Sequence, residues 1–300
     1  MNMAESKVVM VRGRGIFSGS GDLNPAKLPA MIQRGFTLLT GESNPRGGIG
    51  RVFSREERVG IKINTIGGKK LSTRPEVAQA LTDTLAGSGI LPKNMIIWDR
   101  TNRELKEAGY SLNINRDNLK IFATDTEGAG YGTELISHRN IGSLLSSIQT
   151  DLVTASISLA MLKDHGLAGV TAGMKNYFGA IHNPNKYHDS NCDPFVAEVF
   201  DLGPIKQKHR LTILDCLVVQ FHRGPSFHSQ WAEKTGAFIF SLDPVAADII
   251  GWQLIESLRS RKGLPSLKEE KREPLYLLTA EKMGLGRANK SDIKIIEEEV

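Results

Sequence analysis

Short apolar or β-branched runs, several of them apolar throughout, recur along the 300-residue chain and constrain its fold more than any other feature. They lie at 7–11, 59–63, 95–98, 119–123, 152–161, 211–214, 237–242 and 293–300. Strands covered on both faces have this uniformly apolar character, whereas half-exposed strands alternate. Helical segments lie between them: Pro75 precedes Val77, Leu81 and Leu85 at four-residue steps, and Asp243 precedes an apolar-faced segment. This alternation predicts an α/β fold, with a mostly parallel twisted sheet and helices on both faces.

The length fits one large domain or two modest ones. We predict a single domain over 1–300. The glycine-rich stretch near 125–150 is the one boundary that the composition suggests, and it would separate sub-lobes 1–130 and 150–300 with a cleft between them. Segment 44–58, which mixes glycines with charges, predicts an exposed loop.

Charge and hydropathy narrow the class of partner. The net charge is +5, with 38 Lys and Arg scattered along the chain. Nucleic-acid binders concentrate such residues on one element, so we expect no nucleic-acid partner and instead a small-molecule anion. No apolar run approaches the roughly 18 residues of a membrane helix, so we expect no membrane partner. As written, the chain indicates a cytoplasmic protein, and a removed signal peptide would mean export instead. The oligomeric state stays open.

Polar side chains follow several of the predicted strands, at the edge where ligands bind in parallel sheets. They are Asn64, Thr65, Asp99, Arg100, Lys163, Asp164, His165, Asp215 and Asp243. Asp and Asn also end strands simply as caps, and we interpret Asp243 as a helix cap. A lysine, an acid and an imidazole at 163–165 cost repulsion or desolvation that a turn does not require. The predicted catalytic residues are Lys163, His165, His188 and Asp215.

Segment 169–192 carries a second set of candidates. Its glycine-rich turn leads to Lys175 and Asn176, where a helix can begin, and this turn serves either as an anion site or as tight packing.

Two matched motifs follow, each with five residues between histidines: HNPNKYH at 182–188 and HRGPSFH at 222–228. Imidazole, carboxylate and thiolate bind Zn, Fe, Ni or Cu. The predicted metal ligands are His182, His188, Asp189, Cys192 and His222; the alternative is catalytic imidazoles without metal. The two cysteines predict no iron–sulfur cluster.

Several blocks resemble, in order, those of the domain-of-unknown-function 362 family, from about residue 45 to the C-terminus. They are VGIKINTIGGKKLSTRPEVAQAL, MIIWDRTNRELKEAGY, LKDHGLAGVTAGMKNYFGAIHNPNKYHDSNCDP, LTILDC, RGP and SLDPVAADIIGW. The stretch from Lys163 to Pro194 is the most specific. The resemblance implies a fold more than a function. Many relatives carry a four-cysteine ferredoxin segment and often a twin-arginine export signal, and the sequence as given has neither.

A more distant likeness is to the nickel-pincer lactate racemases, in STRP at 72–75 and LKDHGLAGVTAGMK at 162–175. It implies that Arg74 holds a substrate carboxylate, that Lys163 holds a cofactor or substrate, and that His165 transfers protons or binds metal. This likeness concerns fold and site location, not activity. With Arg74, the predicted substrate-binding residues are Asn64, Lys175 and Asn176.

These observations lead to one expected function and one alternative. We expect an enzyme that acts on a small carboxylate or phosphate, by isomerase-like proton transfer or by metal-assisted redox or hydrolysis, with a bound metal or metallocofactor as an option. The alternative is a non-catalytic metal- or metallocofactor-binding protein, such as a carrier or maturation factor.

Overall fold

A nine-stranded sheet organises the chain in the computed structural model, which describes residues 5–300. Residues 1–4, on which the expectation about a leader partly rests, lie outside the described residues. The sheet order is β11-β1-β10-β9-β7-β2-β3-β4, and β8 pairs with β7. The strands are β1 (Ser6–Arg12), β2 (Val59–Lys62), β3 (Met95–Trp98), β4 (Lys120–Ile121), β7 (Ala155–His165), β8 (Gly169–Thr171), β9 (His209–Gln220), β10 (Ala232–Ser241) and β11 (Ile293–Glu299). All eight predicted runs contribute a strand.

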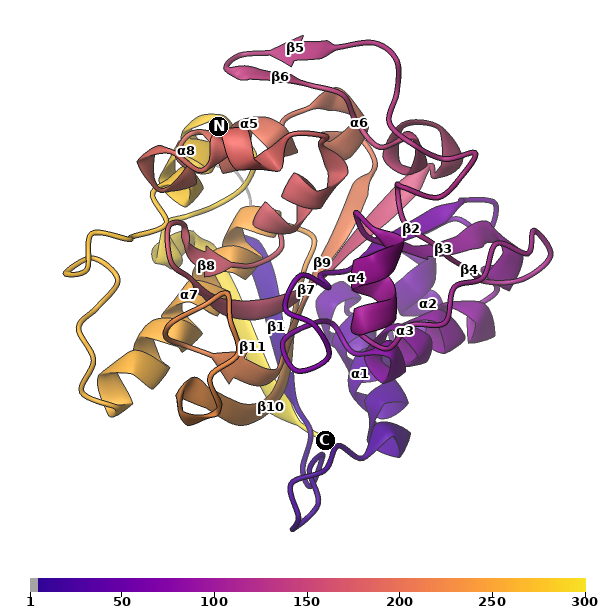
Figure 1. Ribbon diagram of the computed structural model, residues 1–300. Coiled ribbons are helices and arrows are strands. Elements are labelled where there is room, and N and C mark those ends of the chain that lie inside the picture. The colour runs from indigo at the N-terminus through magenta and orange to yellow at the C-terminus, as the bar shows by residue number, and fades with distance from the viewer. Residues whose placement is uncertain (1–4) are drawn as a thin grey trace.

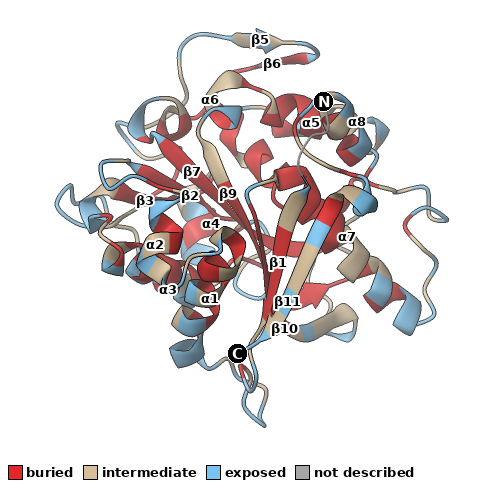
Figure 2. Cartoon of the chain, turned by 180° about the vertical axis from the view of Figure 1, so that it is seen from behind, coloured by how far each residue is buried: buried red, intermediate tan, exposed pale blue. Residues whose placement is uncertain are grey.

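The sheet is mostly parallel, which confirms the predicted fold class. β4, β3, β2, β7 and β9 pair in parallel, as do β1 and β11. β10 is antiparallel to both β1 and β9, and β8 folds back on β7. Most residues of the central strands are buried, as the red strands of Figure 2 show. This double coverage explains why the central strands are largely apolar and do not alternate between apolar and polar residues.

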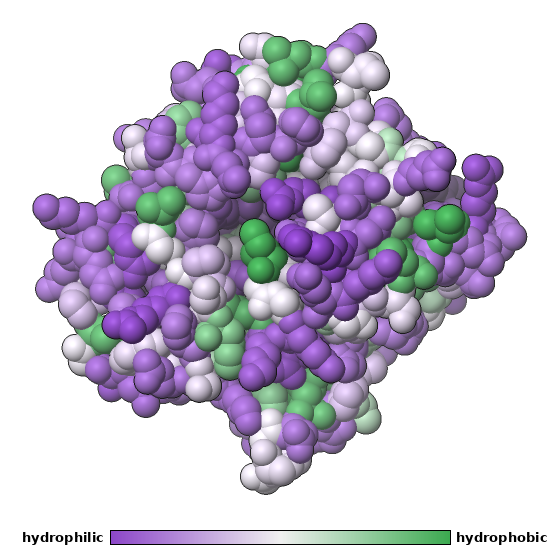
Figure 3. All heavy atoms as spheres, viewed as in Figure 1, coloured by the Kyte–Doolittle hydropathy of each residue, from purple (hydrophilic) through white to green (hydrophobic). Residues whose placement is uncertain are grey.

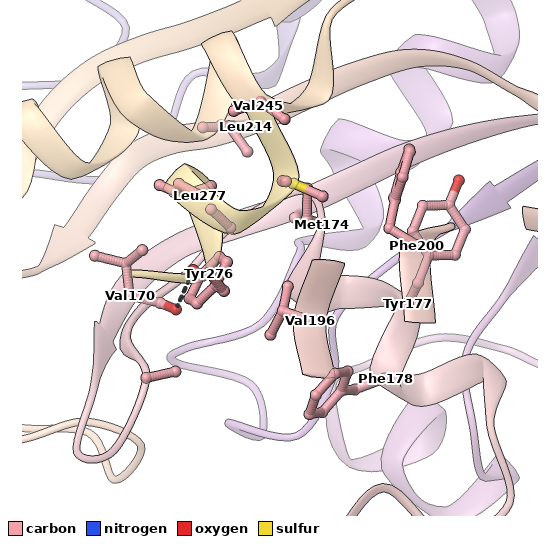
Figure 4. Packing of buried hydrophobic residues seen from close by; sticks show 14 of the residues in the cluster. Val170, Met174, Tyr177, Phe178, Val196, Phe200, Leu214, Val245, Tyr276 and Leu277 are labelled. Atoms are coloured by element: carbon pink, nitrogen blue, oxygen red, sulfur yellow. Dashed lines mark hydrogen bonds between the residues drawn. The ribbon is translucent and has the colours of Figure 1, made fainter. Parts of the chain in front are cut away.

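Helices cover both faces of the sheet (Figure 1). On one face α1 (Leu28–Thr40), α2 (Pro45–Gly50), α3 (Pro75–Gly87) and α4 (Asn102–Glu107) share a core with inward residues of β7 such as Ile157. On the other face α5 (Phe195–Phe200), α6 (Gly203–Lys206), α7 (Pro244–Arg261) and α8 (Tyr276–Lys282) pack with Leu162. Figure 4 shows part of this second core, where Met174 and Tyr177 lie among residues of α5, α7, α8 and β9.

Local signals place several of these helices. The Thr101 hydroxyl accepts a hydrogen bond from the Glu104 amide and opens α4. The Asp243 carboxylate accepts one from the Ala246 amide, which confirms Asp243 as the N-cap of α7. The close approach of α1 to the sheet requires Gly35, because a Cβ there would lie 2.4 Å from the Phe240 ring.

The prediction of an exposed loop over 44–58 is wrong in part. The Asn44 side chain accepts a hydrogen bond from the Gly47 amide and caps α2, with Pro45 in the first turn. Ile49 and Phe53 are buried in the core shared with α1. The glycines of this segment weaken the helical pattern in the sequence, but the helix forms because its few apolar residues pack in the core.

Strands from both halves of the chain belong to the one sheet. β2 pairs with β7, and β1 pairs with β10. The stretch considered as a boundary holds a separate hairpin of β5 (Ile136–His138) and β6 (Ile141–Ser143). Across residues 5–300, no helix combines the length and the apolar character needed to span a membrane.

Candidate functional site

A pocket of about 250 Å³ lies at the carboxyl ends of β2, β3 and β7. Six of the predicted catalytic and substrate-binding residues line it: Asn64, Lys163, His165, Lys175, Asn176 and His188. Asn64, Lys163 and His165 lie together because the carboxyl ends of the parallel strands share one edge of the sheet. The face of the molecule in Figure 3 is mostly hydrophilic, with apolar residues in small separate groups.

An ion pair that the sequence did not reveal supports one wall of the pocket. The ammonium of Lys62, at the end of β2, lies 2.6 Å from Asp99 Oδ1 and 3.1 Å from Asn176 Oδ1. The Thr65 amide and hydroxyl donate to Asp99 Oδ2 at 2.8 and 2.6 Å. Gly179 leaves room for this pair, since a Cβ there would lie 2.7 Å from Lys62 Nζ and would have to displace the ammonium. Lys62 and Asp99 therefore satisfy each other's charge.

Lys163 and Lys175 are buried in the same pocket without such a partner. Lys163 is 1% exposed, and its ammonium donates to Asn64 Oδ1 at 2.9 Å and to the Leu71 carbonyl at 3.0 Å. Lys175 is 7% exposed, and its ammonium lies 3.2 Å from His188 Nε2. Within residues 5–300, neither ammonium forms an ion pair with a carboxylate. Burial lowers the pKa of each lysine to about 8.

The two pocket histidines, His165 and His188, carry their ring protons on different nitrogen atoms. His165 Nδ1 accepts hydrogen bonds from the Leu167 and Ala168 amides at 3.2 and 3.0 Å, so its proton sits on Nε2. His188 Nδ1 lies 3.0 Å from the Pro184 carbonyl, which can only accept, so the proton sits on Nδ1 and the Nε2 lone pair faces Lys175. The rings stack with centroids 5.6 Å apart.

Both imidazoles are held neutral. Burial, followed by the charge of Lys175, lowers the pKa of His165 to about 2. The same two causes lower the pKa of His188. At neutral pH the pair therefore consists of one fixed N–H donor, His165 Nε2, and one fixed acceptor, His188 Nε2.

The glycine-rich turn before Lys175 does not leave its amides free for a ligand. Asp248, buried in α7, accepts hydrogen bonds from the Gly173 and Met174 amides at 2.7 and 2.9 Å. Gly173 is required here, because a Cβ would lie 2.4 Å from Thr212 and 3.0 Å from the Asp248 carboxylate. The protein's own carboxylate thus occupies the anion position that the turn suggested, and it fixes the start of the 3₁₀ helix at 175–180.

Asp164 is also structural. Its carboxylate lies 2.9 Å from the Arg272 guanidinium and accepts a hydrogen bond from the Gly224 amide at 2.8 Å. Arg272 in turn donates to the His165 carbonyl at 2.9 Å. These contacts tie the β7–β8 turn to two distant loops, and they hold the His165 end of the pocket in place.

Two of the predicted catalytic and substrate-binding residues, Asp215 and Arg74, lie outside the pocket. Asp215 was expected where a strand ends, but β9 continues to Gln220, and Asp215 is buried inside it with its carboxylate accepting from the Leu217 amide at 3.0 Å. Burial raises the pKa of Asp215 to about 6. Arg74 lies at the N-terminus of α3, and its positive charge lowers the pKa of Asp215 by less than burial raises it. The pocket lining includes neither residue.

The predicted metal ligands do not share one site, although His188, Asp189 and Cys192 are neighbours. The His182 ring packs edge-on against the Tyr131 ring, with the ring centroids 5.0 Å apart. His222 Nδ1 lies 3.2 Å from an Arg259 guanidinium nitrogen. Asp189 is exposed, whereas Cys192 is buried, and burial raises the pKa of its thiol. In the described part of the chain no three His, Cys, Asp or Glu side chains are grouped closely enough to hold a metal ion. A bound metal stays a prediction, which elemental analysis of wild type and His188→Gln would test.

The sequence reasoning missed Lys62, Phe178 and Glu104, which line the pocket. It included Arg100 at the end of a strand but not its pairing with Glu104, whose charge lies 3.3 Å away. Lys62 carried the clearest signal. A lysine inside an apolar strand costs too much free energy unless it has a partner, and Asp99 at the end of the next strand was the available carboxylate.

Comparison with known proteins agrees with the resemblance described above. The profile of the family described as "Domain of unknown function (DUF362)" matches residues 59–253. The chain belongs to this family. The match includes the pocket residues from Lys62 to His188. The thylakoid-associated protein sll1697 of Synechocystis sp. is 26% identical over 225 residues, which are 69% of this chain and 67% of that protein.

A comparison with solved structures found a distant match. It is a Thermotoga maritima protein whose crystal structure was determined by the Northeast Structural Genomics Consortium. The two share 10% sequence identity with a TM-score of 0.42. The match covers 81% of this chain and 60% of that one.

Proposed function

We propose that the pocket is the active site of an enzyme that binds a small carboxylate or phosphate and moves a proton on it. The observation that carries this proposal is the pair of buried ammonium groups, Lys163 and Lys175, without carboxylate partners in the described chain. Burying an unpaired cation costs several kcal/mol, of order 2–5 for a polar or charged group that keeps some hydrogen bonds. An anionic ligand would recover that cost through charge-assisted hydrogen bonds.

The size of the pocket supports a small ligand. Its volume of about 250 Å³ is below the range of roughly 300–1,000 Å³ that drug-sized ligands occupy. The apolar face of Phe178 borders the charged groups, so the ligand should combine an oxyanion with a short carbon skeleton. A metabolite of a few carbon atoms fits this combination.

The imidazole pair supports proton transfer. The lone pair of His188 Nε2 faces the Lys175 ammonium, and when that ammonium turns to a bound anion the nitrogen can accept a proton. His165 Nε2–H can donate a hydrogen bond to a substrate oxygen. A base and a hydrogen-bond donor on adjacent rings suit removal of a proton next to a carbonyl or carboxyl group. Lys175 next to His188 would stabilise the negative charge that develops.

Calorimetric titration with oxalate, malonate and phosphate tests the binding step. We expect the wild type to bind at least one of them, and Lys163→Met and Lys175→Met to weaken binding by about 10- to 100-fold, as loss of a charge-assisted bond implies. Lys186→Met is the matched control, because Lys186 is an exposed lysine of the same loop. Absence of anion binding in the wild type, or equal binding by all variants, would refute the proposal.

Solvent exchange tests the proton transfer without knowledge of the product. The wild type is incubated in D₂O with short 2-hydroxy and 2-oxo acids, and loss of the carbon-bound proton is followed by NMR. We expect exchange that His188→Gln abolishes, with anion binding retained. Binding without exchange for every acid would restrict the site to ligand binding.

A further inference from the structure

A second cavity lies at the opposite end of the strands that form the candidate active site. Its volume is about 670 Å³, and it shares no lining residue with the first pocket. Arg58 directly precedes β2, Asn94 directly precedes β3, and Lys120 begins β4, so the cavity lies at the amino ends of these strands. We propose that this cavity, the β3–β4 groove, binds a free organic anion with an apolar body, such as a medium-chain carboxylate. This site is separate from the proposed active site and does not depend on it.

The floor of the β3–β4 groove is apolar. Ile96 of β3 and Phe122, the residue after β4, line it and are 3% and 7% exposed. Both belong to the core that α5–α8 cover elsewhere, but residues 126–129 and 151–152 border the groove and lie outside any α-helix. Ile114 and Leu152 stand at its sides, 67% and 37% exposed. A ligand with an apolar body would remove this surface from water.

The rim of the groove is positively charged. Four cations and two carboxylates line it, an excess of two positive charges: Arg58, Lys93, Arg116, Lys120, Glu127 and Asp151. Within residues 5–300, none of the four cations lies within ion-pair distance of a carboxylate. Charge complementarity therefore favours an anion.

Two of these cations are held in place by neutral acceptors. The Arg58 guanidinium donates to the Leu152 carbonyl at 2.7 Å, and the Lys120 ammonium donates to the Lys93 carbonyl. A carbonyl group does not neutralise a cation, and each of these cations has more N–H groups than these bonds use. Arg58 and Lys120 can therefore donate charge-assisted hydrogen bonds to an oxyanion in the groove.

The apolar floor and the cationic rim together select the class of ligand. A small inorganic anion would leave Ile114 and Leu152 in water, and an uncharged hydrocarbon would leave the rim charges uncompensated. An anion with an apolar body satisfies both. The volume lies within the range of roughly 300–1,000 Å³ of small-molecule sites, and a hollow with a buried floor suits a free molecule better than a flat membrane surface.

Calorimetric titration with decanoate, decanol and acetate tests this inference on the full chain. We expect decanoate to bind at least about 10-fold more tightly than decanol or acetate, each of which has only one of the two features. Ile114→Ser and Arg116→Gln should each weaken decanoate binding by about 10-fold, through loss of an apolar contact or of a charge-assisted bond. Both side chains are exposed, so neither change should affect folding. Leu135→Ser and Arg46→Gln are the matched controls, because these exposed residues lie outside the groove.

Two cross-controls separate this site from the candidate active site. Lys163→Met should bind decanoate like the wild type, and Arg116→Gln should bind oxalate like the wild type, because the two cavities share no residue. Loss of decanoate binding in Lys163→Met would assign decanoate to the first pocket and overturn the inference. The same conclusion would follow from no decanoate binding by the wild type, or from equal binding by the wild type, Ile114→Ser and Arg116→Gln.

Sedimentation with phosphatidylglycerol vesicles distinguishes a free anion from a lipid surface. We expect the protein to stay in the supernatant at physiological salt. Sedimentation that Ile114→Ser and Arg116→Gln abolish, in a protein that does not bind free decanoate, would assign this face to a membrane and overturn the inference.

Discussion

Replacing either unpaired pocket lysine with methionine is expected to stabilise the free protein. Burial lowers the pKa of Lys163 and of Lys175 from 10.5 to about 8. One pKa unit corresponds to about 1.4 kcal/mol, so the charged form of each lysine costs the folded state about 3 kcal/mol near neutral pH. Methionine has a similar length and no charge.

Lost hydrogen bonds offset part of this gain. Lys163→Met leaves Asn64 Oδ1 and the Leu71 carbonyl without their donor, at about 1 kcal/mol each, so the net gain is about 1 kcal/mol. Lys175→Met loses one bond to His188, so the net gain is about 2 kcal/mol. Lys62→Met is the contrasting control: it leaves Asp99 buried without its cation and should destabilise by about 3–5 kcal/mol.

Guanidinium unfolding at pH 7 and pH 9.5 provides the assay. The lysine pKa values are lower in the folded protein, so above pH 8 the folded chain loses protons that the unfolded chain keeps up to about pH 10.5. The wild type therefore gains stability as pH rises through this window, and the advantage of both variants shrinks. If Lys163→Met and Lys175→Met instead lose several kcal/mol at both pH values, like Lys62→Met, the reasoning about uncompensated charge is refuted.

Three further predictions concern the structure around the pocket. Asp248→Asn should lower the free energy of unfolding by about 2 kcal/mol in a thermal or denaturant titration, because one amide oxygen cannot replace both acceptors of the Gly173 and Met174 amides. Gly179→Ala should weaken anion binding and destabilise the fold by about 1–3 kcal/mol, because its Cβ would lie 2.7 Å from Lys62 Nζ and displace the ion pair; Gly87→Ala, with open space around it, is the control. Cys192 should react slowly with iodoacetamide at pH 7 until the protein is unfolded, because its thiol is buried and its pKa is raised; rapid labelling of the folded protein would contradict this.

The strands could be predicted because a strand buried on both faces is encoded locally, in a few consecutive apolar residues. Their lengths could not. β9 runs through Asp215 because that carboxylate is buried and accepts a hydrogen bond from the Leu217 amide. β4 is only two residues long, because its pairing with β3 is limited to Lys120 and Ile121. Both outcomes depend on neighbouring elements and not on the local sequence.

The same distinction applies to the site. Asn64, Lys163 and His165 could be placed together because strand ends in a parallel sheet share an edge. The matched histidine spacing at 182–188 and 222–228 was misleading as a guide to proximity. Spacing within a loop does not determine which way the loop faces, and His222 lies against Arg259. The Lys62–Asp99 pair joins residues 37 positions apart, so only the pairing of β2 with β3 brings them into contact.

The buried charge of the unpaired lysines lowers the stability of the free protein, and the same charge raises its affinity for an anion. An anion at 1,000 times its Kd stabilises the wild type by about 4 kcal/mol, whereas a variant that binds 100-fold more weakly gains only about 1.4 kcal/mol. For a 100-fold loss of affinity we therefore expect the order of stability to reverse. Lys175→Met should be more stable than the wild type without ligand, and less stable at saturating oxalate or phosphate, in paired denaturant titrations. Lys186→Met should follow the wild type under both conditions. A constant stability difference with and without anion would mean that the buried charge of Lys175 is not the group that the ligand neutralises.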